Sequence, residues 1–443
     1  MSDSATPTSR ADRIGMLDTT RGIAVLGILL MNIVGLGLPD AYEDPTNWGG
    51  ATGANLAAWR ITSLFFEGTM RGLFTLLFGA GALLFLQRHT TQSYGQPGAM
   101  KLYYRRTVLL IAFGLINAYV LLWEGDILFY YGVIGLVLHA FRKLSTRWLL
   151  ITGLAILAIP TVVKIMDRAD YIALQERAET AESLRESGQP LNAQLRFAID
   201  ELRWTNESHK PSLDEQEIAI QQVARGYASA ARYFRTRTMY LETYFFSEYI
   251  FAEFLGMMLI GMALLKLGVL TGEASHRTYL AMAWAGYLLG SAVNLWEIQR
   301  LESSDFSVPA IMDSYVTYDL GRVLTTAGHV GLIGLLWQSA WFAGAKRQLG
   351  AVGQMALSNY LSQSVLCLFV FTGAGLGWFG QLQRYQLYYV VAAIWLMQLL
   401  WSSWWLQRFQ FGPAEWLWRT LTYGRRPPMR ISAAPAPSAA SIN

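Results

Sequence analysis

The sequence predicts an all-α fold: a polytopic membrane helix bundle of about ten transmembrane helices, with a small helical extracytoplasmic insert. Three observations lead to this prediction. Hydrophobic residues make up 53% of the 443-residue chain and charged residues only 15%, whereas a typical soluble domain has roughly 25% charged residues. Apolar runs close to the length of a bilayer-crossing helix recur along the chain. Basic residues gather in every second short loop, as they do in oriented membrane proteins.

The individual spans follow from apolar runs bounded by charged residues. A crossing helix needs about 20 apolar residues, so the shorter runs must extend into their polar flanks. We expect the first run to stay in the mature protein, because no small-x-small cleavage site follows Leu38. The predicted spans are residues 22–38, 72–87, 106–123, 126–141, 146–165, 242–265, 278–296, 322–343, 355–377 and 385–405.

The distribution of lysine and arginine over the short loops predicts the orientation. One set of loops holds 19 of them and the alternate set holds five. Positive loops stay inside, so both termini are expected in the cytoplasm. The predicted segments are 1–21 (cytoplasmic), 22–165 (spans one to five), 166–241 (extracytoplasmic insert), 242–405 (spans six to ten) and 406–443 (cytoplasmic, disordered after about 427).

The insert carries a helix-start signal. Ser212 followed three residues later by Glu215 fits a capping box, and the run to Tyr240 is compatible with helix. Two interpretations stay open for this segment. It is either a cap of solvated helices or a lid over an outward-facing cavity.

Polar residues at membrane depth are candidate site residues, because they cost free energy there. On the outer side, Glu67 and Arg71 are four residues apart, and we expect them to pair on one helix face. Asp126 precedes the fourth span and is placed to cap it. Arg322 and His329 are seven residues apart and share one face of the eighth span. The structural alternatives are a helix-linking ion pair, a helix cap and a hydrogen-bonded core histidine.

A second group of polar residues is expected mostly toward the inner side. Asp18 and Arg21 precede the first span, and Asn359 and Gln363 lie in the ninth, while Asn32 lies in the outer half of the first. Amides inside membranes commonly bridge helices, which is the structural alternative for these three side chains.

Several classes of site are not expected. No two histidines have metal-ligand spacing, and no HExxH, P-loop, GxGxxG or GxSxG motif occurs. The single cysteine, Cys367, cannot form an intramolecular disulfide or a multi-thiolate metal site. We therefore expect no metal and no bound cofactor. The composition also argues against nucleic-acid binding, which leaves the lipid bilayer as the expected partner.

Five strings resemble the YeiB-like family of bacterial inner-membrane proteins, a domain of unknown function. The resemblance implies the bacterial inner membrane as the location and extends over nearly the whole chain. The strings are residues 17–32 (LDTTRGIAVLGILLMN), 70–81 (MRGLFTLLFGAG), 125–128 (GDIL), 353–364 (GQMALSNYLSQS) and 411–424 (FGPAEWLWRTLTYG). The last two resemble the family's carboxyl-terminal domain.

The start of the first string has a wider resemblance. Its Asp-x-x-Arg-Gly pattern is similar to that of heparan-alpha-glucosaminide N-acetyltransferase and of membrane O-acetyltransferases, which use cytosolic acetyl-CoA. By this motif, Asp18, Arg21 and Asn32 correspond to residues of those enzymes. The glucosaminide enzyme has a histidine in the loop after this span, whereas residues 38–60 here contain none.

These observations support two hypotheses of different class. The first is a membrane acyltransferase that moves an acyl group from cytosolic acyl-CoA to an extracytoplasmic acceptor, such as a sugar, a lipid-linked molecule or another small molecule. The second is a transporter or permease for a small polar solute, with buried acids such as Glu253 relaying protons. A non-catalytic membrane partner is the third.

The first hypothesis assigns roles to the candidate residues. His329 is the first choice as general base and Glu67 or Asp126 the second, with Arg71 polarising the acyl oxygen. The residues expected to bind substrate or donor are Asp18, Arg21, Asn32, Asn359, Gln363 and Arg322.

Overall fold

The computed structural model describes residues 14–92 and 98–431. The expected amino-terminal segment, apart from residues 14–21, and the tail from residue 432 lie outside these ranges. The described chain is helical, and its β-pairing is confined to an isolated bridge between Phe409 and Arg430. The all-α prediction is therefore confirmed for the described residues.

The helices follow one another in chain order and differ widely in length. They are α1 (Gly15–Gly37), α2 (Gly53–Phe65), α3 (Thr69–Gln92), α4 (Gly98–Tyr119), α5 (Leu128–Leu138), the 3₁₀ helix η1 (His139–Lys143), α6 (Thr146–Glu186), α7 (Ala193–His209), α8 (Leu213–Ala224), α9 (Tyr227–Tyr240), the π-helix η2 (Leu241–Ile250), α10 (Phe251–Lys266), α11 (His276–Ser303), α12 (Val308–Gln338), α13 (Ala343–Gln354), α14 (Ala356–Phe371), α15 (Arg384–Leu406) and α16 (Pro413–Tyr423).

Among the residues that the structure describes, six stretches of helix are long and apolar enough to cross a bilayer, which makes the chain a multi-pass membrane protein. They are Gly15–Gly37, Gly53–Gln87, Thr146–Glu186, Tyr227–Lys266, Val308–Gln338 and Arg384–Leu406. The four other predicted spans coincide with α4, α5, α11 and α14, which are helical but outside this set. At 11 and 16 residues, α5 and α14 are shorter than a full crossing. The count of ten is thus not confirmed.

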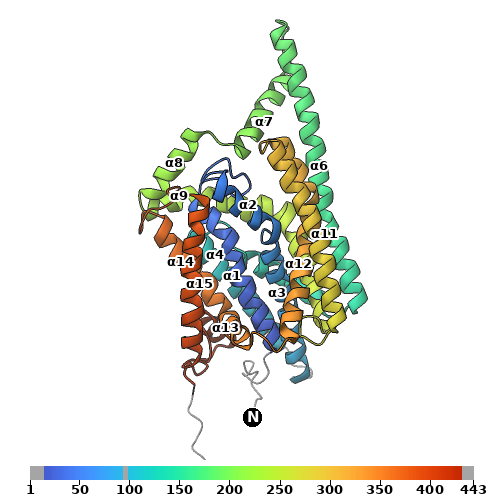
Figure 1. Ribbon diagram of the computed structural model, residues 1–443, viewed down its shortest axis with the longest axis vertical. Helices are drawn as coiled ribbons and strands as arrows, with labels where there is room; N and C mark the ends of the chain where they lie inside the picture. The colour runs from blue at the N-terminus through green and yellow to red at the C-terminus, as the bar shows by residue number, and fades with distance from the viewer. Residues whose placement is uncertain (1–13, 93–97, 432–443) are drawn as a thin grey trace, which may run out of the picture.

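The predicted insert is helical and lies toward one end of the molecule (Figure 1). In Figure 1, α1 runs through the middle of the bundle, α13 lies near one end, and α7 with the far half of α6 projects at the other. With 41 residues, α6 is about 60 Å long at 1.5 Å per residue, roughly twice the hydrocarbon core. It continues without a break past residue 165, where the predicted span ends. The capping box of Ser212 and Glu215 is present at the start of α8, as predicted.

The central position of α1 depends on two glycines. A Cβ atom at Gly22 would overlap the Leu349 carbonyl oxygen, and one at Gly353 would overlap the Asp18 carbonyl oxygen. Glycine at both positions therefore allows the backbones of α1 and α13 to touch. The hydroxyl of Thr19 donates to the Lys346 carbonyl at 3.2 Å and ties the same two helices together. This contact sets Asp18 and Arg21 beside the start of α14.

Candidate functional site

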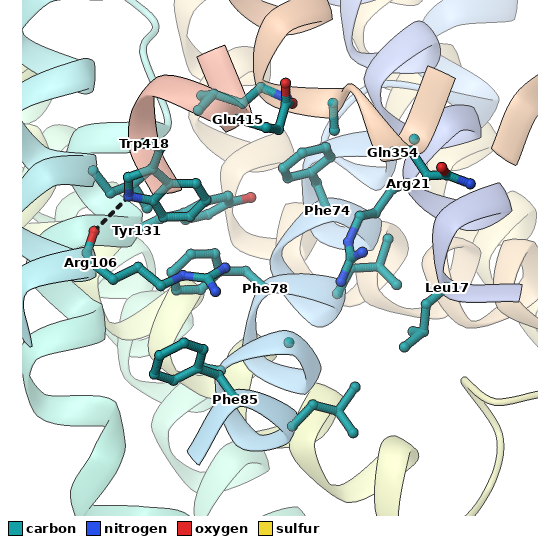
Figure 2. Close-up of a pocket in the computed structure, with 18 of the residues that line it drawn as sticks. Leu17, Arg21, Phe74, Phe78, Phe85, Arg106, Tyr131, Gln354, Glu415 and Trp418 are labelled. Atoms are coloured by element: carbon teal, nitrogen blue, oxygen red, sulfur yellow. Dashed lines mark hydrogen bonds between the residues drawn. The ribbon is translucent and has the colours of Figure 1, made fainter. Parts of the chain in front are cut away.

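A cavity of about 270 Å³ lies where α1, α3, α4, α5, α14 and α16 meet, at the end of the bundle near α13. Its wall is mostly aromatic and aliphatic, and its charged residues come from helices far apart in sequence (Figure 2). Each of the five family-like strings supplies lining residues. They include Leu17, Asp18 and Arg21; Phe74 and Phe78; Leu128; Gln354 and Tyr360; and Phe411, Glu415, Trp418 and Arg419.

Glu415 fixes α16 against the first turn of α14. Its carboxylate accepts hydrogen bonds from the backbone N–H of Leu357 at 2.7 Å and of Ser358 at 3.1 Å, and from the Ser358 hydroxyl at 2.5 Å. These are groups that the start of a helix leaves without internal partners, and the helix dipole favours an anion there. Burial raises the pKa of Glu415 above its ordinary value, and the hydrogen bonds from Ser358 oppose that rise.

Three arginines reach the cavity from three different helices. Arg21 of α1 donates to the Asp18 carboxylate at 3.0 Å. The guanidinium of Arg106 lies over the ring of Phe85 at 5.0 Å and over that of Trp418 at 4.3 Å. The guanidinium of Arg419 lies 4.5 Å from the Phe411 ring centroid. The indole N–H of Trp418 also donates to the Arg106 carbonyl at 3.0 Å, which joins α16 to α4.

The cavity is also lined by Tyr131 and Tyr360. The hydroxyl of Tyr131 lies 2.9 Å from that of Thr75, whose own hydroxyl donates to the Arg71 carbonyl. The hydroxyl of Tyr360 lies 3.4 Å from the Asp126 carboxylate and accepts from the Ile127 N–H at 3.2 Å. Asp126 is therefore separated from the cavity by a single phenol.

Asp126 has the hydrogen bonds of a helix cap. Its carboxylate accepts from the backbone N–H of Phe129 at 2.8 Å, at the start of α5, and from the Asn117 amide at 2.8 Å. It is 1% exposed. The placement at the start of the helix is the one expected from the sequence, and Asn117 is an additional partner that the sequence did not suggest.

The expected pairing of Glu67 with Arg71 is wrong. Glu67 follows the end of α2, and Gly68, with φ of +68°, turns the chain before α3 begins at Thr69. Because the two residues do not share one helix, the i,i+4 geometry does not apply. Glu67 instead accepts from Arg322 at 3.1 Å, and Arg71 donates to Glu253 at 2.9 Å.

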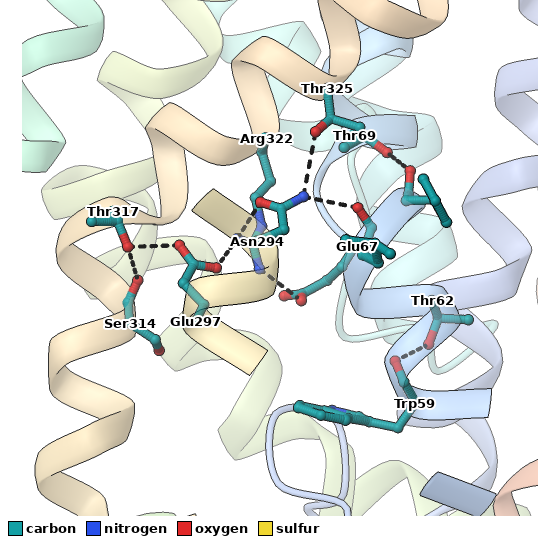
Figure 3. Close-up of polar contacts among 12 residues, drawn as sticks. Trp59, Thr62, Glu67, Thr69, Asn294, Glu297, Ser314, Thr317, Arg322 and Thr325 are labelled. Atoms are coloured by element: carbon teal, nitrogen blue, oxygen red, sulfur yellow. Dashed lines mark hydrogen bonds and ion pairs between the residues drawn. The ribbon is translucent and has the colours of Figure 1, made fainter. Parts of the chain in front are cut away.

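Arg322 is the centre of a buried polar cluster on α12 (Figure 3). It donates to Glu67 of the α2–α3 turn, to the amide oxygen of Asn294 at 3.1 Å, and to Glu297 of α11 in a close ion pair. The guanidinium of Arg322 also lies over the aromatic ring of Tyr318, 4.1 Å from the ring centroid. Arg322 is 8% exposed and does not line the cavity, so its contacts join three helical segments.

His329 has partners at both ring nitrogens. Nε2 lies 2.8 Å from the Phe65 carbonyl oxygen, and Nδ1 lies 2.8 Å from the Tyr287 hydroxyl. A carbonyl can only accept, so Nε2 carries a proton, and in the neutral imidazole Nδ1 accepts from the phenol. The imidazole is 9% exposed and links α2, α11 and α12. It does not line the cavity.

The three amide residues lie apart from the cavity. Asn359 donates to the Val352 carbonyl at 3.0 Å and accepts from the Trp401 indole at 2.9 Å. Gln363 donates to the Val25 carbonyl at 3.0 Å and to Gln398 at 3.1 Å. These bonds hold α14 to α1 and α15. Asn32 is half-buried on α1 and is not among the lining residues.

Sequence reasoning missed four of the charged or aromatic groups at the cavity: Arg106, Glu415, Trp418 and Arg419. Arg106 and Arg419 belong to the 19 loop charges that predict the orientation, and Glu415, Trp418 and Arg419 lie inside the family-like string 411–424. One feature of the sequence could have indicated them: these residues and Arg21 all fall on the same predicted side of the membrane.

Within the described ranges, no group of three or more His, Cys, Asp or Glu side chains is placed to hold a metal.

The fold and the cavity define a multi-pass helical membrane protein with an apolar-walled pocket and a cluster of cations at one end. Residues 264–425 match the family model described as a protein of unknown function, DUF418. This range contains the strings 353–364 and 411–424. No solved structure matches the chain.

Three relatives extend the similarity to nearly the whole chain. The chain is 28% identical to the uncharacterized protein YxaH of Bacillus subtilis, over 94% of this chain and 96% of the relative. It is 28% identical to the uncharacterized protein YeiB of Escherichia coli, over 92% and 95%. It is 27% identical to a 39.9 kDa protein from the amylase 3' region of Bacillus acidopullulyticus, over 96% and 98%. The resemblance to the YeiB-like family is confirmed.

Proposed function

We propose that this protein is an acyl-CoA-dependent membrane acyltransferase whose donor binds in the cavity between α1, α3, α4 and α16. The observation that carries the proposal is the cavity itself. Arginines from three helices meet an apolar, aromatic wall at the end of the bundle that the loop charges predict to be cytoplasmic. A phosphate-bearing carrier with an apolar tail needs both kinds of surface.

The reaction needs an acceptor hydroxyl or amine to attack the thioester carbonyl carbon. The carbon–sulfur bond then breaks, CoA leaves as a thiolate, and the proton lost by the acceptor goes to a general base before protonating that sulfur. Asp126 is the candidate base closest to the cavity, because its carboxylate touches Tyr360 in the cavity wall at 3.4 Å. In this proposal Asp18 orients Arg21 at the donor end, across a bond of 3.0 Å.

The acceptor would enter from the opposite side. We assign the acceptor side to the polar region around α3, α12 and the α2–α3 turn, which holds Glu67, Arg71, Arg322 and His329. Thr75 connects the cavity wall to the preceding turn of α3, because its hydroxyl contacts Tyr131 of the wall and the carbonyl of Arg71. In this arrangement His329 and Arg322 shape the acceptor side. Asn359 and Gln363 hold α14 to its neighbours α1 and α15, and Asn32 of α1 stays a candidate for binding the substrate.

The alternative of a transporter for a small polar solute is favoured by a different observation. Three ion pairs at span depth join helices of the two halves of the chain: Arg71 with Glu253, Arg322 with Glu67, and Lys164 with Asp319. Such pairs are placed to exchange partners or protons during transport. In that case Glu253 would relay protons.

Binding of acyl-CoA to the purified protein separates the two functions. Tight, saturable binding that depends on Arg21 supports the acyltransferase. A pH change driven by an added polar solute in sealed vesicles, without acyl-CoA binding, supports the transporter. Failure of both assays would leave the non-catalytic partner as the remaining hypothesis and would overturn the acyltransferase proposal.

A further inference from the structure

Arg106 is held in an unusual setting at the cavity. Its guanidinium carbon lies over two aromatic rings, 5.0 Å from the ring centroid of Phe85 and 4.3 Å from that of Trp418. Contact with two aromatic rings restricts the position of the guanidinium and leaves its N–H groups available as hydrogen-bond donors. The same Trp418 anchors the backbone of Arg106 through its indole N–H at 3.0 Å. The cation is therefore preorganised by neighbours that offer it no negative charge.

The carboxylates of the cavity are engaged elsewhere. Glu415 accepts three hydrogen bonds at the start of α14, and Asp18 accepts from Arg21 at 3.0 Å. Over the described part of the chain, no carboxylate forms an ion pair with Arg106. The nearby charges of Arg419 and Arg21 repel it instead. Cations held close together, with one of them lacking a counter-ion, create a strongly positive region in an otherwise apolar cavity.

We propose that Arg106, clamped by Phe85 and Trp418, is the centre of a binding site for a phosphate group. A phosphate has several acceptor oxygens and at least as much negative charge as a single carboxylate, so it can accept from the guanidinium fork and still interact with the neighbouring cations. The inference deepens the donor assignment and rests on it for the phosphates of CoA. The phosphate of an anionic phospholipid and free inorganic phosphate have the same chemistry.

The test is equilibrium binding to the purified full-length protein. The probes are CoA, pantetheine (which lacks every phosphate), inorganic phosphate, and nanodiscs of phosphatidylglycerol or phosphatidylcholine. We expect CoA to bind and pantetheine to bind at least tenfold more weakly.

Arg106→Gln should weaken CoA binding roughly tenfold or more, because a charged hydrogen-bond donor is lost. Arg105→Gln is the matched control, since Arg105 is the exposed neighbour on α4 and does not line the cavity; it should change the affinity less than twofold.

Three results would overturn the inference. The first is equal affinity of CoA for the Arg106 and Arg105 variants. The second is equal affinity of CoA and pantetheine for the unmodified protein. The third is the absence of binding by every phosphate-bearing probe. If Arg106→Gln does not fold, Arg106→Lys and the thermal shift of the unmodified protein with each probe decide the question. Binding of phosphatidylglycerol or inorganic phosphate that requires Arg106, without CoA binding, would keep the phosphate site and reject the acyl-CoA donor.

Discussion

Arg71 of α3 and Glu253 of α10 form an ion pair between two helices that are far apart in sequence. A terminal nitrogen of Arg71 lies 2.9 Å and 3.1 Å from the two carboxylate oxygens of Glu253. The guanidinium also lies 5.5 Å from the ring centroid of Phe254, the next residue along α10. The side chains are 25% and 14% exposed, so both charges are largely removed from water. The pair therefore connects α3 to α10.

The first prediction concerns this pair. Arg71→Gln or Glu253→Gln alone should lower the stability by about 3–5 kcal/mol, because each leaves an uncompensated buried charge. The double variant should recover most of that loss. The measurement is thermal or denaturant unfolding of the purified protein in detergent.

The control for this prediction is an exposed ion pair. Arg60, whose side chain is 52% exposed, pairs with Glu302 at 2.5 Å. Because surface pairs contribute little, Arg60→Gln should change the unfolding midpoint far less. Glu67→Gln should not be rescued by Arg71→Gln, since those two residues do not pair. Rescue in that combination would contradict the assignment.

Features that depend on local composition were predictable from the sequence. Six predicted spans coincide with helices that can cross a bilayer, and the capping box appears at Ser212. Both depend on residues close together in the chain. The family-like strings were also recognisable, since they are contiguous.

Partnerships between distant segments were not predictable in the same way. The pairing of Glu67 with Arg71 failed because Gly68 breaks the helix between them, and their actual partners come from α12 and α10. The cavity depends on the close contact of Gly22 with α13, which brings Asp18 and Arg21 beside the start of α14. The residues around a glycine do not indicate which distant segment of the chain its backbone will contact.

The second prediction tests that contact. Gly353→Ala should lower the folded yield and the unfolding midpoint, because the new methyl group would overlap the Asp18 carbonyl oxygen of α1. Overpacking of this kind costs about 1–3 kcal/mol or more, since backbone atoms must move. Gly344→Ala is the control: it lies on the same helix, and its added Cβ would have no heavy atom within 4 Å. Equal stability of the two variants would exclude the close packing of α1 on α13.

The third prediction concerns His329. His329→Ala should reduce stability by about 1–3 kcal/mol, because the Phe65 carbonyl and the Tyr287 hydroxyl lose their partner in a buried site. His329→Gln retains an amide that can donate and accept, and it should recover part of the loss. Thermal unfolding of the three proteins provides the measurement. A fully stable His329→Ala would show that the imidazole is not needed to join these helices, and would strengthen its candidacy as a base.

The fourth prediction is the topology. Reporter fusions at Lys101, Arg142 and Arg347 should report the cytoplasm, and one at Asp200 should report the outside, following the 19-to-five loop bias. The structure places α7, which carries Asp200, at the end opposite α13 (Figure 1). The same compartment for Asp200 and Arg347 would contradict this arrangement. It would also remove the argument that the arginine-lined cavity faces the cytoplasm.

The fifth prediction is a pH dependence of stability that originates at Glu415. Burial raises its folded-state pKa above the ordinary value of 4.5. The folded protein therefore holds this proton more tightly than the unfolded chain does. The resulting contribution to stability is fully present below about pH 4.5 and is lost as the pH rises through the folded-state pKa.

The measurement is the unfolding midpoint of the unmodified protein and of Glu415→Gln over this pH range. The midpoint of the unmodified protein should fall relative to that of the variant as the pH increases. Gln is the matched variant because it keeps an oxygen acceptor for Leu357 and Ser358 but cannot ionise. A midpoint difference that stays constant from pH 4 to 8 would show that the pKa of Glu415 is the same in the folded and unfolded protein. A midpoint difference that moves in favour of the unmodified protein would show that the hydrogen bonds at the start of α14 lower this pKa more than burial raises it.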